Sequence, residues 1–185
     1  MTARILCMIV LLLEIRGLLL SIPGRGWKTL IFYTQLSNMI TAASAILLVV
    51  LGQPYWITAL RYISTCMLIM TFFVTICVLV PMGGDPKILL WSGNGLYHHV
   101  LCPIISTTSY IFVEEHALRG LIWLPAIITL AYGLVMLYLN WLKKVDGPYP
   151  FFRVHNQSIK ATVIWMIVLM AVITGISTVV WFLTR

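Results

Sequence analysis

Six long apolar segments, separated by short polar gaps, dominate this chain of 185 residues. A helix that crosses a lipid bilayer needs about 20 mostly apolar residues, and every segment comes close to that length. Only 9% of the residues are charged, whereas a soluble domain carries roughly a quarter. Because so short a chain cannot hide so much apolar surface from water, we expect lipid to be its solvent. The segments are Ile5–Ile22, Thr29–Leu51, Ile57–Met82, Leu96–Val113, Leu118–Leu142 and Ala161–Leu183.

The gaps between these segments contain residues that usually end helices. Pro and Gly occur at Pro23-Gly24, Gly52-Gln53-Pro54, Gly83-Gly84-Asp85-Pro86 and Gly147-Pro148-Tyr149-Pro150, and a short charged gap lies at Glu114-Glu115-His116. None of the gaps is long enough to fold separately. The sequence therefore predicts an all-α fold: an integral membrane bundle of six transmembrane helices in a single domain over residues 1–185.

No set of metal ligands stands out in the sequence. All the cysteines lie in apolar segments without Cys-x-x-Cys spacing, at Cys7, Cys66, Cys77 and Cys102. We expect them to be small buried side chains rather than a disulfide framework or a zinc site. Adjacent histidines on one helix rarely ligate one ion, and they cannot supply both axial ligands of a haem. We therefore expect no metal and no cofactor.

Basic residues are divided unevenly between the two sides of the predicted bundle. We call the side that holds both termini side A and the opposite side B. Side B has Arg25, Lys28, Lys87, Lys143, Lys144, Arg153 and Lys160, and side A has Arg4, Arg61, Arg119 and Arg185. Cytoplasmic loops are enriched in Lys and Arg, which predicts side B in the cytoplasm and both termini outside. The basic residues form no stripe, so we expect membrane lipids as partners and no nucleic acid.

Polar side chains gather near side B, at similar depths on several predicted helices. They are Glu14, Arg16, Thr34, Gln35, Ser37, Asn38, His98, His99 and Asn140. With a rise of about 1.5 Å per residue, these positions fall within roughly 5–12 Å of one membrane face. Since ionisable groups inside a span are expensive, we expect a polar cavity that opens toward side B. Single members can instead tie neighbouring helices together, and Arg16 can extend to the membrane surface.

This polar layer contains the parts of a nucleophilic site. A threonine hydroxyl needs an adjacent base to remove its proton, and histidine, with an unperturbed pKa of about 6.5, suits that role. Thr34 is the candidate nucleophile. Because successive helix positions point about 100° apart, only one of His98 and His99 is expected to face it. Asn38 lies one turn away as the candidate oxyanion donor, and Glu14 is the intramembrane carboxylate that could orient a histidine.

Three short motifs occur in a recognisable order: Gly26-Trp27-Lys28 followed by Tyr33-Thr34-Gln35-Leu36-Ser37-Asn38, then Asn94-Gly95-Leu96-Tyr97-His98-His99-Val100-Leu101-Cys102-Pro103, then Gly147-Pro148-Tyr149-Pro150-Phe151. They resemble the androgen-induced-gene family of multi-span membrane hydrolases, and its bacterial branch in particular. Animal members cleave fatty acid esters of hydroxy fatty acids with a threonine and a histidine. The resemblance implies a bacterial cell membrane, Thr34 as nucleophile and His98 or His99 as its partner. His99 is favoured because it lies four residues before Pro103.

The chain departs from the family pattern at two places. The catalytic threonine of the animal proteins follows its Trp-Lys pair more closely than Thr34 follows Trp27-Lys28. When the family motif is aligned without gaps on Asn94 and Pro103 of this chain, Gly95 occupies the position of the family's catalytic histidine. In both cases the residue is shifted along the sequence by about one helical turn, and in the same direction. The nucleophile and its histidine can therefore have moved together.

The leading hypothesis is therefore a membrane-embedded hydrolase of lipid esters that works through an acyl-threonine intermediate. We expect a fatty acid ester as substrate, contacted by Gln35, Ser37 and Asn140, with its carboxylate held by Arg16 or by a basic residue of side B. One alternative is a non-enzymatic protein that binds or transports a lipid or small molecule through the same cavity. Another is a subunit of a larger membrane complex.

Overall fold

The fold is helical throughout the part of the chain that the computed structural model describes, residues 1–116 and 120–185. These described residues are 82% helical and contain no strand, which confirms the predicted all-α fold. Leu118, where the fifth predicted segment begins, and Arg119 lie outside the described residues, as does the side chain of Arg25.

Within the described part of the chain, five helices are long and apolar enough to cross a membrane. They are α1 (Thr2–Arg25), α2 (Tyr33–Leu51), α3 (Tyr55–Val74) with its continuation η2 (Thr75–Leu79), α6 (Leu124–Trp141) and α7 (Ile159–Leu183). Each coincides with one of the predicted segments. Their length and composition fit an integral membrane protein, as the sequence predicts.

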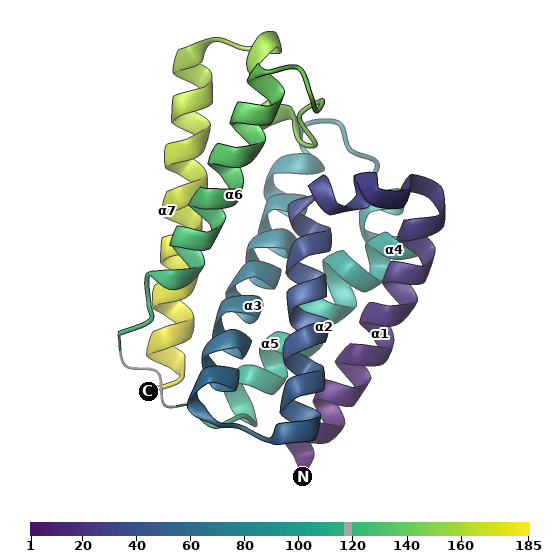
Figure 1. Cartoon of the computed structure of the whole chain (residues 1–185), viewed down its shortest axis with the longest axis vertical. Coiled ribbons are helices and arrows are strands. Elements are labelled where there is room, and N and C mark those ends of the chain that lie inside the picture. The colour runs from purple at the N-terminus through teal and green to yellow at the C-terminus, as the bar shows by residue number, and fades with distance from the viewer. Residues whose placement is uncertain (117–119) are drawn as a thin grey trace.

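The predicted segment Leu96–Val113 differs from the others. It consists of the π-helical turn η4 (Leu96–Leu101) followed by α5 (Cys102–Phe112), and the short helix α4 (Gly93–Gly95) comes directly before it. Pro103 explains the division, because it has no N–H to donate and its ring crowds the carbonyl of the preceding turn. The segment still runs from side B back to side A (Figure 1). The helical pieces follow one another without a break from Gly93 to Phe112. This stretch is not among the helices that are both long and apolar enough to cross a membrane, so the predicted count of six spanning helices is not confirmed among the described residues.

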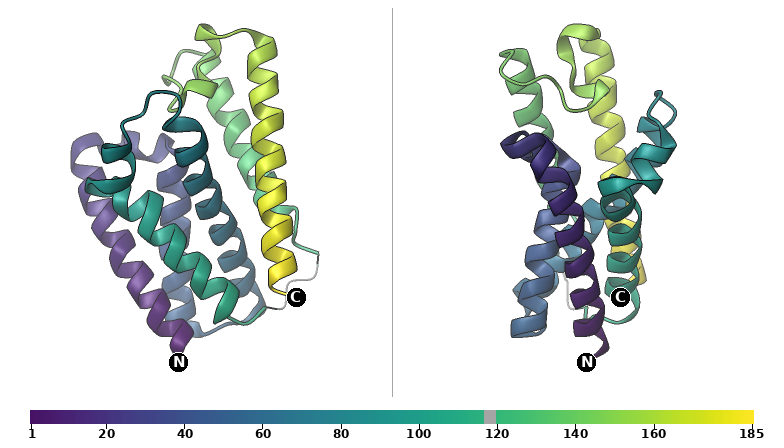
Figure 2. Two further views of the ribbon diagram at one scale, coloured as in Figure 1. Left: turned by 180° about the vertical axis from the view of Figure 1, so that it is seen from behind. Right: turned by 90° about the vertical axis from the view of Figure 1, so that its right-hand side faces the viewer.

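The helices form two groups that α3 joins. Helices α1, α2, α3 and α5 pack side by side, while α6 and α7 pack on each other and contact α3 (Figures 1 and 2). Both termini lie at the same end of the bundle, side A (Figure 1). At side B the short helix η1 (Gly26–Ile31) connects α1 to α2, η3 (Lys87–Trp91) precedes α4, and η5 (Pro150–Phe152) and η6 (Val154–Asn156) lie between α6 and α7.

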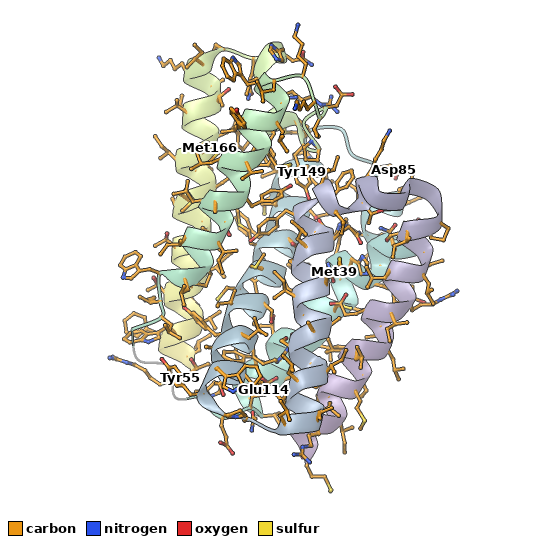
Figure 3. All side chains as sticks on the ribbon, viewed as in Figure 1. Met39, Tyr55, Asp85, Glu114, Tyr149 and Met166 are labelled. Atoms are coloured by element: carbon orange, nitrogen blue, oxygen red, sulfur yellow. The ribbon has the colours of Figure 1, made fainter. Side chains whose placement is uncertain are left out.

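Helix α2 turns its polar residues toward the interior of the bundle. Ser37, Thr41 and Ser44 are buried, and each hydroxyl donates to a carbonyl three or four residues earlier in the same helix, at 2.9 Å. Ser37 and Ser44 also contact hydroxyls of α3, at 3.1 and 3.2 Å. Such hydroxyls satisfy their hydrogen bonds without water and hold adjacent helices together. Polar side chains occur at both ends of the bundle, with Tyr149 toward side B and Glu114 toward side A (Figure 3).

Candidate functional site

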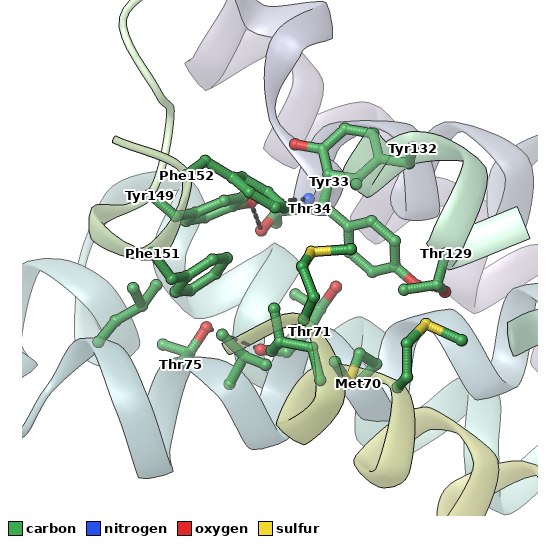
Figure 4. Close-up of a pocket in the computed structure, with 16 residues that line it drawn as sticks. Tyr33, Thr34, Met70, Thr71, Thr75, Thr129, Tyr132, Tyr149, Phe151 and Phe152 are labelled. Atoms are coloured by element: carbon green, nitrogen blue, oxygen red, sulfur yellow. Dashed lines mark hydrogen bonds between the residues drawn. The ribbon is translucent and has the colours of Figure 1, made fainter. Parts of the chain in front are cut away.

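Thr34 lies in the first turn of α2, against the side chain of Tyr149. The Thr34 N–H donates to the Tyr149 hydroxyl at 3.2 Å, and the two hydroxyls are also 3.2 Å apart (Figure 4). The first N–H groups of a helix have no partner within it, so the tyrosine oxygen satisfies one of them. Since that oxygen accepts from the backbone, its own hydrogen can be donated to Thr34 Oγ1.

Tyr149 comes from the loop between α6 and α7, and the aromatic residues around it fix its position. Its ring stacks on Phe151 with centroids 5.2 Å apart and an interplanar angle of 14°. It also meets the edge of Phe32, at 6.1 Å. Gly147 allows this fold of the loop, because a Cβ there would lie 2.7 Å from the carbonyl carbon of Phe152.

Asn140 holds this same loop and does not lie beside Thr34. Its Nδ2 donates to the Val145 carbonyl, and its Oδ1 accepts from the Val154 N–H, both at 2.9 Å. The sequence predicts Asn140 as a substrate contact. In the structure its side chain bonds to the backbone of the loop that carries Tyr149.

Two pockets meet at Thr34. The apolar cavity lies between α2, α3, α6 and α7 and measures about 510 Å³, including space open to the outside (Figure 4). The side B pocket measures about 990 Å³ on the same basis. Thr34, Leu79 and Tyr149 line both. The apolar cavity also contains residues such as Met70, Thr71, Tyr132, Gly133, Phe152, Met166 and Leu169, and the side B pocket contains Phe32, Gln35, Ile88, Leu89, Asn94, Gly95 and His99.

The two adjacent histidines face different parts of the protein. His99 lines the side B pocket together with Thr34, and its Nδ1 lies 2.7 Å from the Leu89 carbonyl. A carbonyl only accepts hydrogen bonds, so Nδ1 carries the hydrogen, and the lone pair of the neutral ring is on Nε2. His98 is fully buried inside the bundle, and its Nδ1 lies 3.1 Å from Gln35 Nε2. His99 is thus the histidine that shares a pocket with Thr34.

The remaining predicted residues differ in whether they line one of the two pockets. Gln35 lines the side B pocket, whereas Ser37, Asn38 and Arg16 line neither pocket. Asn38 Nδ2 donates to the Thr34 carbonyl at 2.6 Å, and the Ser37 hydroxyl donates to the same carbonyl. Both side chains therefore fix the backbone of the first turn of α2. Arg16 is exposed on α1, about 200° around the helix from the buried Glu14.

Glu14 forms a second buried cluster with His98 and Gln35. Its Oε2 lies 3.6 Å from His98 Nε2, and neither side chain is exposed. Helix α1 comes this close to His98 because residue 17 is glycine. A Cβ at Gly17 would lie 2.1 Å from His98 Nε2, which is far inside van der Waals contact.

We expect Gly17→Ala to destabilise the bundle by about 1–3 kcal/mol, because either His98 or α1 must shift to make room. The melting temperature of the purified protein in detergent measures this effect. The matched control is Gly175→Ala on α7, where nothing lies within 4 Å of the added Cβ. Equal melting temperatures for the two variants would contradict the close contact at Gly17.

A third cluster, at side A, is one that the sequence analysis missed. Arg61 of α3 and Glu114 form a bidentate ion pair, with Nε to Oε2 at 2.9 Å and the second guanidinium nitrogen to Oε1 at 2.7 Å. Both side chains are buried. Ser109 donates to Glu114 Oε1 at 2.8 Å, and Arg61 donates to Ser44 at 3.4 Å. The available signal was an arginine inside an apolar segment, which requires an acidic partner at the same depth.

Together the fold and the site define an all-helical membrane bundle in which one threonine lies between the apolar cavity and the side B pocket. Comparisons with protein-family models, with curated proteins and with solved structures found no match to this chain. The motif resemblance described above therefore stays a prediction.

Proposed function

We propose that this protein is a membrane-embedded hydrolase of lipid esters, with Thr34 as nucleophile and His99 as general base. The observation that carries the proposal is the position of Thr34, where the apolar cavity meets the pocket that contains His99. A long acyl chain suits the apolar cavity, because its walls are aliphatic and aromatic side chains. Its ester group then lies beside Thr34, and the more polar part of the substrate extends into the side B pocket.

The proposed reaction has two steps. In the first, His99 Nε2 takes the proton of Thr34 Oγ1, the oxygen bonds to the acyl carbon, and the ester C–O bond breaks. His99 gives its proton to the departing alkoxide, which leaves as an alcohol. In the second step His99 takes a proton from water, and the water oxygen attacks the acyl carbon. The bond to Thr34 breaks, Oγ1 regains a proton from His99, and a free fatty acid leaves.

Tyr149 is the proposed oxyanion donor, in place of Asn38. Its hydroxyl already contacts Thr34 Oγ1, and the N-terminal end of α2 adds a positive partial charge at the same place. Asn38 is less suited, because its amide nitrogen donates to the Thr34 carbonyl. The proposal thus gives a chemical role to Tyr149, the tyrosine of the tyrosine-proline pair in the motif resemblance.

For the substrate and the location, the proposal follows the motif resemblance and the charge pattern. We propose fatty acid esters of hydroxy fatty acids as the substrate class and a bacterial cell membrane as the site of action, with side B in the cytoplasm. The basic residues of side B favour this orientation and would attract the free carboxylate of such a substrate.

Labelling with a fluorophosphonate tests the nucleophile directly. We expect Thr34 of the purified wild-type protein to displace fluoride from the probe and to carry one phosphonyl group afterwards. Mass spectrometry locates the modified residue. Thr34→Ala should not react. Thr41→Ala is the matched control, because Thr41 is a buried threonine of the same helix that lines neither pocket. Labelling of Thr34→Ala at the wild-type level would refute the mechanism.

The second candidate function is binding or transport of a lipid or small molecule without chemistry. The buried Glu14 and His98 favour it, because ionisable groups inside a membrane often mark transport pathways. A protein that binds the ester but neither hydrolyses it nor reacts with the probe would support this candidate over the hydrolase.

A further inference from the structure

The cluster of Glu14, Gln35 and His98 has no role in the proposed hydrolysis, yet it contains the most unusual polar groups of the interior. Glu14 and His98 are fully buried, and Gln35 is 2% exposed. Both carboxylate oxygens of Glu14, His98 Nε2 and Gln35 Oε1 make no well-formed hydrogen bond, although the Cys102 thiol interacts with the Glu14 carboxylate and the His98 ring with the Glu14 backbone. Buried polar atoms without partners are rare in folded proteins. Their grouping at one place therefore indicates that something is bound between them, such as a proton.

A directional chain of hydrogen bonds assigns the hydrogen on His98. Ser21 donates its hydroxyl hydrogen to the Gly17 carbonyl at 2.8 Å, so the Ser21 oxygen accepts from Gln35 Nε2 at 3.5 Å. The same amide nitrogen donates to His98 Nδ1 at 3.1 Å. His98 Nδ1 is therefore an acceptor, and the hydrogen of the neutral ring is on Nε2, facing Glu14 Oε2 at 3.6 Å.

An ionised Glu14 beside a neutral His98 would leave one buried negative charge. Among the described residues, the groups of α2 that contact His98 are the neutral amides Gln35 and Asn38. The thiol of Cys102 on α5 and the ring of His99 on η4 are titratable groups that interact with the pair. The guanidinium of Arg61 on α3 also interacts electrostatically with Glu14, but it is bound in a bidentate pair to Glu114. A lone charge in an apolar interior is too costly to persist.

We propose that Glu14 and His98 share one additional proton and form a proton-binding site inside the bundle. The added proton makes the pair neutral overall: either His98 is doubly protonated and its Nε2–H faces an ionised Glu14, or Glu14 is a carboxylic acid beside the neutral ring. The site exchanges its proton with the side B pocket through Gln35, which lines that pocket and also contacts His98. When the proton is on His98 Nδ1, the Gln35 amide turns so that Oε1 accepts it. This inference does not depend on the hydrolase proposal.

Two spectroscopic measurements on the purified full-length protein locate the proton. Histidine-specific ¹⁵N labelling reports the protonation of each imidazole nitrogen, and infrared spectroscopy reports a protonated carboxyl group. At neutral pH we expect either a doubly protonated His98 ring or a carboxylic acid band from Glu14. Glu14→Gln should lose that signal and leave His98 singly protonated. Glu115→Gln, which changes an exposed carboxylate, should leave both spectra unchanged.

The proposal has clear contrary outcomes. A wild-type protein with singly protonated His98 and ionised Glu14 at neutral pH would overturn it, and this measurement needs no variant. Gln35→Leu tests the route: the proton of the pair should exchange with D₂O more slowly than in the wild type. Unchanged exchange would refute the path through Gln35. The shorter carboxylate of Glu14→Asp should retain the proton signal if Glu14→Gln fails to fold.

Discussion

Thr34→Ala is expected to reduce turnover of a fatty acid ester of a hydroxy fatty acid by at least about 10³-fold, because removal of a nucleophile abolishes the covalent route. His99→Ala should cause a loss of similar size, since a threonine hydroxyl reacts poorly without its base. Thr34→Ser keeps a hydroxyl in place and should retain part of the activity. The measurement is release of free fatty acid by purified protein in detergent or liposomes.

The controls separate loss of chemistry from loss of fold. Thr41→Ala removes a hydroxyl that bonds only within α2 and should behave as wild type. Tyr149→Phe removes the proposed oxyanion donor and should lower turnover by roughly 10²–10³-fold. If Thr34→Ala hydrolyses the ester at the wild-type rate while Tyr149→Phe does not, the nucleophile lies elsewhere in the pocket.

Glu114→Gln is expected to produce the largest loss of stability, about 3–5 kcal/mol, because it leaves the Arg61 guanidinium buried without its counter-charge. The pair is bidentate and wholly inside the bundle, so neither solvent nor a headgroup can replace the carboxylate. Unfolding in detergent, followed by circular dichroism, measures the free energy of unfolding directly.

A neighbouring carboxylate gives the matched control for this stability prediction. Glu115 is exposed, and Glu115→Gln should change the free energy of unfolding by no more than about 0.5 kcal/mol. Replacing both partners, with Arg61→Met and Glu114→Leu, should recover most of the loss, since a buried pair can often be exchanged for apolar side chains. A Glu114→Gln variant as stable as the wild type would show that Arg61 finds another partner.

Much of the fold could be predicted from apolar segments alone, because a spanning helix must satisfy its backbone internally over a fixed length. That rule does not describe Leu96–Val113. There Pro103 interrupts the hydrogen-bond pattern, and a hydropathy pattern carries no information about a π-helical turn. The same turn places His98 inside the bundle and His99 in the side B pocket.

The site could be predicted only where depth in the membrane decides position. Thr34, Gln35 and His99 share a pocket, as their depths imply. Asn38 lies at the same depth but bonds backbone carbonyl groups, because a short amide on a helix has near neighbours that compete for it. Tyr149 is 115 residues from Thr34 and reaches it from a loop, where no periodicity applies.

The division of the bundle into two helix groups has a consequence for how a substrate arrives. The apolar cavity is lined from both groups, by α2 and α3 on one side and by α6 and α7 on the other. The second group contacts the first chiefly through α3, so the boundary between them follows the cavity. An acyl chain diffusing in the bilayer meets that boundary from the side. Under the proposed function, this would be a path by which a lipid reaches Thr34 without passing through water.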